Sequence, residues 1–299
     1  MSLIPHKPNH NLDKCVIVSP HRKYSGRNNL LKNIKPLGEE CVFCSDHFKK
    51  EEFISQWPSE GHWGVVRLKN IFPIINKRGA TNEIIVPTPI HSATFGSLSI
   101  ENTMQYFFMM ARSVARSSKK MSYTSVFTNE GPGGGASKSH LHTQIVGMDF
   151  VPNIISELSN LSKANCHFCS FTSGNYGYKI AEQGFFAAFV PNDAKNYYQI
   201  KIIGPHVQGI QHLNLSQFED LAKIFIKCQK ALESCVEYPS MNILYRSGPH
   251  DGRDYHFHID IIPRLNFAGG FEYDTGVVVL SSYPRAWARD LKAAIKKQK

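Results

Sequence analysis

The chain has 299 residues, of which 42% are hydrophobic and 19% are charged. This is the composition of a folded globular protein with room for one or two domains, and it excludes a disordered chain. No apolar run approaches the roughly 18 residues of a membrane-spanning helix, and the N-terminal MSLIPHKPNHNLDK lacks the apolar core of a secretory signal. We therefore expect a cytoplasmic protein that has no membrane partner.

The charge balance favours an anionic ligand. Lys and Arg outnumber Asp and Glu by 34 to 24, which gives a formal net charge of +10. A nucleotide, a sugar phosphate or nucleic acid would each satisfy this excess. The basic residues form no stripe with aromatic residues of the kind that stacks single-stranded nucleic acid, so we do not expect a nucleic acid partner.

In chain order, the first half has the pattern of one α+β unit. The helix is predicted because apolar residues recur there at three-to-four spacing. The predicted elements are a Cys-x-x-Cys pair at 41–44, β-rich stretches at 63–75 and 81–91, a helix that begins at Ser99, a strand at 122–131, a glycine-bearing loop and an alternating strand at 140–147.

The second half repeats this order. Ser216 and Glu219 have the spacing of a capping box and predict the helix start. The elements are a Cys-x-x-Cys pair at 166–169, β-rich stretches at 184–193 and 197–206, a helix that begins at Ser216, a strand at 240–249 and an alternating strand at 256–263. An internal repeat of this length indicates a duplicated supersecondary unit.

The two copies also agree in the spacing of their histidines. His140 follows His91 by 49 residues, and His256 follows His206 by 50. We therefore predict an α+β fold of two tandem modules, at 1–150 and 151–299, each an antiparallel sheet with a helix packed on one face.

Each copy carries a set of residues that zinc prefers. Thiolate and imidazole groups are the usual ligands of tetrahedral zinc, and a Cys-x-x-Cys pair supplies a short chelate loop. Because no export signal is present, such pairs indicate metal or redox chemistry before disulfides. The sequence thus predicts one or two zinc ions per chain. The ligands would be Cys41, Cys44, His91 and His140 at the first site and Cys166, Cys169, His206 and His256 at the second.

The strand at 140–147 carries the most reactive pattern. His140, His142 and Gln144 project to one face of a strand because side chains alternate. The loop before it, NEGPGGGASK, has glycines that let backbone amides approach phosphate oxygens, while Ser137 and Lys138 could add a hydroxyl and a charge. The combination predicts a phosphate-handling site.

These residues resemble a known family. The segment FTNEGPGGGASKSHLHTQIVG is similar to the active-site motif of the galactose-1-phosphate uridylyltransferase family, a branch of the histidine-triad superfamily. The resemblance extends to VSPHR at 18–22, KNIFP at 69–73, VPTPIH at 86–91 and AGGFEYDTGV at 268–277. It implies a doubled histidine-triad-like fold, a homodimer, and a transferase of carbohydrate or galactose metabolism that acts on a nucleotide sugar and a sugar phosphate.

The resemblance also implies roles for particular residues. His142 would attack the α-phosphorus to form a covalent nucleotidyl-histidine, Gln144 would hold the non-bridging oxygens, and zinc-bound His140 would orient its neighbour. The remaining positions implied by the family are Asn70 and Phe72 for base and ribose, Asn129, Gly135 and Ser137 for phosphates, and Phe271 and Glu272 for the hexose.

Departures from the family pattern bear on the substrate. The second Cys-x-x-Cys with its histidines resembles the ADP-sugar phosphorylase-like branch. Uridylyl transfer to a hexose 1-phosphate is therefore preferred only narrowly over one alternative. That alternative is adenylyl transfer to phosphate from an ADP-sugar or a dinucleoside polyphosphate. A third hypothesis is a non-catalytic, zinc-stabilised nucleotide-binding module. Because Asp260 replaces the glutamine after His258, we predict that the second module is non-catalytic.

Overall fold

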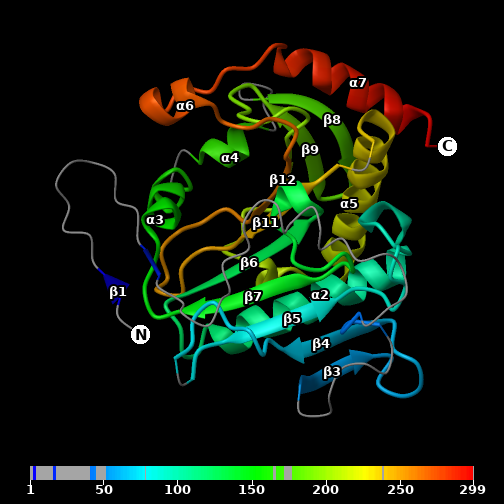
Figure 1. Cartoon of the computed structure of the whole chain (residues 1–299), viewed down its shortest axis with the longest axis vertical. Coiled ribbons are helices and arrows are strands. Elements are labelled where there is room, and N and C mark those ends of the chain that lie inside the picture. Colours follow the sequence, from blue (N-terminus) through cyan, green and yellow to red (C-terminus); the bar gives the residue numbers. More distant parts are fainter. Residues whose placement is uncertain are drawn as a thin grey trace.

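A ten-stranded antiparallel sheet runs through the protein (Figure 1). The computed structural model describes residues 3–4, 16–17, 41–44, 52–77, 79–163, 166–171, 177–237 and 239–298; the VSPHR segment at 18–22 lies outside the described residues. The strands of the large sheet are β3 (Phe53–Trp57), β4 (Val65–Lys69), β5 (Asn82–Val86), β6 (Tyr123–Glu130), β7 (Thr143–Met148), β8 (Gly177–Gln183), β9 (Phe186–Pro191), β10 (Ile200–Ile203), β11 (Met241–Arg246) and β12 (His258–Pro263). A separate two-stranded sheet joins β1 (Leu3–Ile4) to β2 (Val16–Ile17).

The strand order reproduces the repeat. From edge to edge the strands run β3-β4-β5-β7-β6-β11-β12-β10-β9-β8, so each half has the same order when it is followed from its outer edge inward. The halves join where β6 pairs antiparallel with β11, with Asn129 opposite Asn242. The predicted duplicated α+β fold is confirmed, and the two expected sheets are one continuous sheet. The boundary between residues 150 and 151 stays a prediction.

Both long helices pack on the same face of the sheet. They are α2 (Ile100–Ser117) and α5 (Leu215–Cys235), and α7 (Pro284–Lys296) packs beside α5. The shorter helices are α3 (Asn153–Asn160), α4 (His167–Ser170) and α6 (Gly270–Thr275). Buried aromatic rings from α2, α5 and β11 meet edge to face beneath the helices, and this core spans both halves of the sheet.

The predicted start of the first long helix is confirmed, and that of the second is wrong. Ser99 caps α2, because its side chain accepts a hydrogen bond from Asn102 N. For α5 the cap is Asn214, whose side chain and that of Gln217 satisfy each other's backbone amides in a capping box. Ser216 lies inside the first turn and donates to Asn214 Oδ1. An asparagine caps as well as a serine, and here it comes two residues earlier.

The face of the sheet opposite the long helices carries the predicted site. Leu141 and Ile145 belong to the core under the helices, whereas Val146 and Met148 belong to a cluster on the other face. The alternation predicted for residues 140–147 therefore holds, although β7 begins only at Thr143. Within the described residues, no helix has both the length and the apolar character to cross a membrane.

Candidate active site and metal centres

The first predicted set of metal ligands comes together beyond the end of β5. Cys41 and Cys44 form a turn that is closed by a hydrogen bond from Cys44 N to Cys41 O (3.1 Å). Sγ of Cys44 lies 3.3 Å from Nδ1 of His91 and 3.7 Å from Nδ1 of His140. Sγ of Cys41 lies 3.6 Å from the same nitrogen of His140, and all four ligand atoms lie within 4.8 Å of one another.

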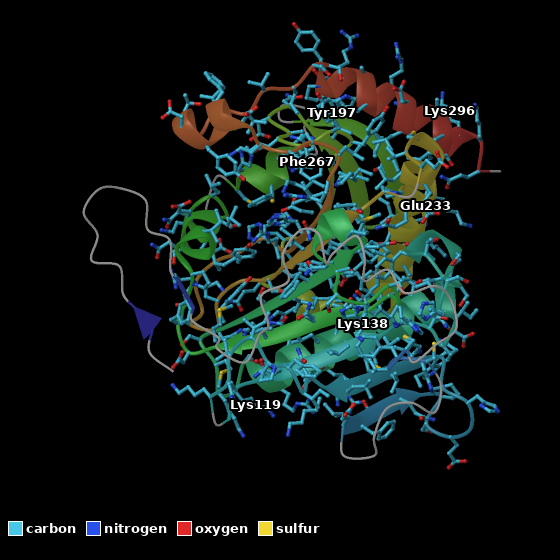
Figure 2. The ribbon with its side chains drawn as sticks, viewed as in Figure 1. Lys119, Lys138, Tyr197, Glu233, Phe267 and Lys296 are labelled. Atoms are coloured by element: carbon cyan, nitrogen blue, oxygen red, sulfur yellow. The ribbon has the colours of Figure 1, made fainter. Side chains whose placement is uncertain are left out.

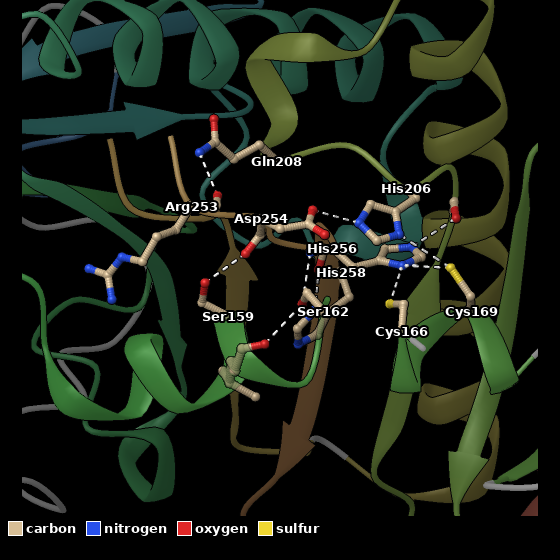
Figure 3. Close-up of polar contacts among 12 residues, drawn as sticks. Ser159, Ser162, Cys166, Cys169, His206, Gln208, Arg253, Asp254, His256 and His258 are labelled. Carbon is tan, nitrogen blue, oxygen red and sulfur yellow. Dashed lines mark hydrogen bonds and ion pairs between the residues drawn. The ribbon is translucent and has the colours of Figure 1, made fainter. Parts of the chain in front are cut away.

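The second predicted set has the same arrangement (Figure 3). Sγ of Cys166 lies 3.3 Å from Nδ1 of His256. Sγ of Cys169 lies 3.3 Å from Nδ1 of His206 and 3.4 Å from Nδ1 of His256. The sequence repeat is thus a repeat of two donor sets in space.

The donor chemistry and spacing of both sets fit zinc. Bond lengths of about 2.3 Å to sulfur and about 2.0 Å to nitrogen place tetrahedral ligand atoms about 3.6 Å apart, which the observed separations match. Each histidine turns Nδ1 toward its cluster and Nε2 toward a hydrogen-bond partner, as ligand histidines do. These partners are Ser139 Oγ for His91 (2.9 Å), Thr88 O for His140 (2.8 Å), Asp254 Oδ1 for His206 (2.9 Å) and Gly204 O for His256 (3.0 Å).

His142 is held with one ring nitrogen available. Its Nδ1 lies 2.9 Å from the backbone carbonyl of His140. A carbonyl oxygen only accepts, so Nδ1 carries the proton and Nε2 has the free lone pair. Within the described residues Nε2 makes no hydrogen bond. The side chain is buried, with Phe43 packed on the ring at 5.0 Å between centroids, and burial lowers the pKa of His142, which favours the neutral ring.

The corresponding histidine of the second half is sealed. His258 is 0% exposed, and its Nδ1 lies 2.8 Å from the carbonyl of His256. Phe168 stacks on its ring at 4.2 Å, closer than Phe43 lies to His142. Its Nε2 is buried and has no hydrogen-bond partner. This nitrogen lies 3.8 Å from Oδ2 of Asp260, in a side chain that has no exposed surface.

The position of Gln144 is taken in the second half by Asp260. Its carboxylate pairs with Lys201 and lies 3.5 Å from Nε of Arg246. Although burial opposes ionisation, the positive charges of Lys201 and Arg246 hold the pKa of Asp260 below its usual range. The two cations are thus engaged by a carboxylate of the chain itself.

The glycine-rich loop packs against the second half of the sheet. A Cβ on Gly131 would lie 2.4 Å from Ser240 Oγ, and a Cβ on Gly134 would lie 2.4 Å from the carbonyl oxygen of Met241. Close approach to Ser240 and to β11 therefore gives Gly131 and Gly134 a structural reason, and approach of the loop amides to a phosphate stays a prediction. Gly135, with φ +79°, has no described atom within 4 Å of its Cβ position and remains open toward a ligand.

The residues expected to contact phosphate surround the segment before β7. Pairing of β6 with β7 ends with Thr128 opposite Thr143, so Asn129 continues opposite His142. Gln144 lies on the same face of β7 as His142. Ser137 is exposed in the loop, and Lys138 lies over the first half of the sheet (Figure 2).

The expected base-binding residues lie in the turn after β4. Asn70 is 7% exposed, and its Oδ1 accepts a hydrogen bond from Phe72 N at 2.9 Å. Phe72 is 72% exposed. Asn70 also lines a cavity of 490 Å³ together with Lys69 and Lys120. His142 does not line this cavity.

The expected hexose-binding residues are not brought to His142 within one chain. Phe271 and Glu272 lie on α6, where Glu272 Oε2 accepts a hydrogen bond from Gly269 N at 2.8 Å. In Figure 1, α6 lies at the far end of the molecule from β7. Phe271 is 56% exposed.

Several residues around the site carried no signal in the sequence. Phe43 was hidden by its place between two cysteines, and Ser240 and Asn242 carry no motif of their own. Glu130 stands in the sequence only as one residue of the loop motif. Burial and the neighbouring Glu233 raise the pKa of Glu130 to about 8, and its Oε2 is buried without a hydrogen bond.

The chain thus consists of two fused copies of one α+β unit, each with a Cys₂His₂ donor set whose last histidine opens a His-x-His segment. The family described as Galactose-1-phosphate uridyl transferase, N-terminal domain, matches residues 49–152. The chain is 21% identical to an ADP-glucose phosphorylase of Arabidopsis thaliana, over 94% of this chain and 90% of that protein. It is 24% identical to a galactose-1-phosphate uridylyltransferase of Thermotoga maritima, over 87% of this chain and 91% of the relative.

Solved structures have the same fold. The crystal structure of the Arabidopsis thaliana ADP-glucose phosphorylase with bound ADP-glucose superposes with a TM-score of 0.78 at 20% identity, covering 88% of this chain and 93% of that one. A uridylyltransferase structure reaches a TM-score of 0.79 at 22% identity, covering 96% and 97%. The family model thus matches residues 49–152, and similarity to the individual relatives covers nearly the whole chain. The similarity to this family that the sequence predicted is confirmed.

Proposed function

We propose that this enzyme carries a nucleoside monophosphate on His142 as a covalent intermediate. The observation behind the proposal is the contact of Nδ1 with the carbonyl of His140 (2.9 Å), which makes Nε2 the nucleophilic nitrogen. Nε2 attacks the α-phosphorus of a nucleotide sugar, a P–N bond forms, and the sugar 1-phosphate leaves with the electron pair of the broken P–O bond. An acceptor phosphate oxygen then attacks the same phosphorus, and the P–N bond breaks.

The surrounding residues are assigned by position. Amide and hydroxyl groups of Asn129, Gln144 and Ser137, with the backbone of Gly135, would donate hydrogen bonds to the oxygens of the transferred phosphoryl group. No proton donor is required, because a sugar phosphate leaves as a stable anion. Asn70 and Phe72 would contact the base and ribose.

The two donor sets would hold zinc. Zinc bound by Cys41, Cys44, His91 and His140 would fix the ring of His140 and so stiffen the segment that presents His142. The second ion would play the same structural part in the second half, with Cys166, Cys169, His206 and His256 as ligands. We assign no step of the reaction to either ion.

The preferred reaction is transfer of UMP from a nucleotide sugar to a hexose 1-phosphate. A second candidate is adenylyl transfer from an ADP-sugar, or a dinucleoside polyphosphate, to inorganic phosphate. It is favoured by the match to an ADP-glucose phosphorylase over 94% of the chain, against 87% for the uridylyltransferase. A non-catalytic nucleotide-binding module is the remaining alternative.

The sugar site is proposed to require a homodimer. Because α6 lies far from β7 in the same chain, Phe271 and Glu272 could contact a hexose at a reacting histidine only across subunits. The homodimer and the cytoplasmic location stay predictions. Sedimentation of the purified protein tests the first of these directly.

The test is the intact mass of the protein after brief incubation with UDP-glucose, ADP-glucose or diadenosine tetraphosphate. The expected result is an adduct of one UMP or one AMP, absent in His142→Ala and retained in His258→Ala. The nucleotide in the adduct identifies the donor, and release by galactose 1-phosphate or by orthophosphate identifies the acceptor. Binding of nucleotide without an adduct in any folded, zinc-loaded sample would leave the non-catalytic module as the function.

A further inference from the structure

The joint between β6 and β11 places a side chain of the second half directly behind the proposed phosphate site. Asn242 on β11 is the cross-strand partner of Asn129 on β6. Its Nδ2 donates to Oδ1 of Asn129 at 2.9 Å and to the carbonyl of Gly134 at 2.7 Å. One amide of the second half therefore holds both the end of β6 and the glycine-rich loop.

These two contacts determine which way the amide of Asn129 faces. The carbonyl of Gly134 can only accept, so the NH₂ group of Asn242 must point toward it. The same NH₂ group faces Asn129, which must therefore present its oxygen to Asn242. The NH₂ group of Asn129 is left facing away, and within the described residues it makes no hydrogen bond.

Further contacts hold the loop in the same place. Ser240 Oγ accepts a hydrogen bond from Gly133 N at 3.1 Å. A Cβ would meet Ser240 at Gly131 and the backbone carbonyl of Met241, in β11, at Gly134 so closely that one of the two segments would have to shift. The loop that precedes His142 thus packs against Ser240 and β11, which lie over 100 residues away in the sequence.

We propose that Asn242 is a positioning residue for nucleotidyl transfer. It turns the NH₂ group of Asn129 toward the transferred phosphoryl group and fixes the loop that carries Gly135 and Ser137. The inference rests on the proposed function. It gives the second, non-catalytic half a role in the chemistry of the first: without β11, the donors of the phosphate site have no fixed direction.

The test substitutes Asn242→Asp, which keeps the shape but faces two acceptor oxygens with a carboxylate. The rate of nucleotidyl-histidine formation in a single turnover should fall about 10- to 100-fold, as is usual when a supporting hydrogen-bond partner is lost. A matched control is Gln208→Glu. Gln208 Nε2 likewise donates to two loop carbonyls, of Pro249 and Arg253 (both 3.0 Å), in the second half, so this variant should retain the rate.

A double-mutant cycle separates positioning from general stability. If Asn242 acts partly through Asn129, Asn242→Ala should slow adduct formation more in the wild-type background than in Asn129→Ala, where only its contact with the loop remains. Additive effects, or a rate for Asn242→Asp within about twofold of the wild type, would overturn the inference. Hydrogen exchange provides a readout without turnover: amides of residues 133–136 should exchange faster in Asn242→Asp. If the wild type forms no adduct, the proposed function fails, while unchanged exchange contradicts the bracing itself.

Discussion

Gly134→Ala probes the contact between the glycine-rich loop and β11. The new Cβ would lie 2.4 Å from the carbonyl oxygen of Met241 and 3.1 Å from its carbonyl carbon. These are main-chain atoms of the β6–β11 joint and cannot rotate away. The loop must shift, at about 1–3 kcal/mol for overpacking, and the Asn242 contact with the Gly134 carbonyl adds about 1 kcal/mol if it is lost.

We therefore expect Gly134→Ala to lower Tm by about 5 °C. Because a displacement of about 1 Å in a positioning loop can cost about 100-fold in rate, adduct formation at His142 should fall by about 10- to 100-fold. Differential scanning fluorimetry and the intact-mass assay measure the two effects on the same samples.

Two control variants test whether the effect depends on this contact with the backbone of β11. At Gly133 the nearest atoms to an added Cβ are side-chain atoms of Ser240, at 3.0 and 3.2 Å, so Gly133→Ala should have a smaller effect. Gly252 lies in the corresponding region of the second half, and a Cβ there would meet no described atom within 4 Å. Gly252→Ala should therefore cost only about 1–2 kcal/mol of stability, because alanine is disfavoured at φ +82°. Unchanged Tm and rate in Gly134→Ala would refute the packing of the loop on β11.

Three further predictions concern pH, the core and the metal. Burial and the charge of Glu233 raise the pKa of Glu130 to about 8, whereas the pKa in the unfolded chain is about 4.5. Between these values the native state binds a proton that the unfolded chain releases. The contribution of Glu130 to stability is therefore fully present below pH 4.5 and is lost as the pH rises to 8. Urea unfolding of Glu130→Gln should show a flatter pH dependence and about 1–3 kcal/mol more stability at pH 7; an unchanged slope would contradict the assignment. Tyr106→Phe removes a buried hydroxyl that forms hydrogen bonds with Thr143 Oγ1 (2.6 Å) and Tyr245 OH (2.7 Å). This variant should lower the free energy of unfolding by about 1–3 kcal/mol in the same assay. An unchanged free energy of unfolding would contradict a stabilising role for these two hydrogen bonds. Purified protein should contain two zinc ions per chain by elemental analysis, with Cys44→Ser losing one and chelation lowering Tm; full zinc content in that variant would exclude the first site.

Much of the site could be predicted from the sequence because ligand chemistry restricts residue type. Thiolates and imidazoles at Cys41, Cys44, His91 and His140 have few other uses in that pattern, and a second copy of the same set in the same order makes chance an unlikely origin for either. The alternation that separates His142 from Leu141 follows from strand geometry alone. These inferences needed only local spacing and one repeat.

Other features depended on contacts between distant segments. Helix α5 is capped by Asn214, two residues before the predicted cap Ser216. Asparagine and serine are nearly equal as caps, so the local sequence does not distinguish the two positions. Gly131 packs against Ser240 and Gly134 packs against the backbone of β11, and no periodicity in the loop reveals either contact. Phe168 seals His258 more tightly than Phe43 covers His142, a difference of packing between similar Cys-x-Phe-Cys turns.

The sequence by itself determined the duplicated unit, the two donor sets and the histidine beside a glycine-rich loop, because periodicity and metal-ligand chemistry can be recognised from residue types and their spacing. Only the tertiary structure decided that the two sheets are one, that Asn242 of the second half contacts the glycine-rich loop, and that His258 is fully buried. Those outcomes depend on which edges pair and which side chains meet across more than 100 residues, and such contacts are set by the packing of the whole chain.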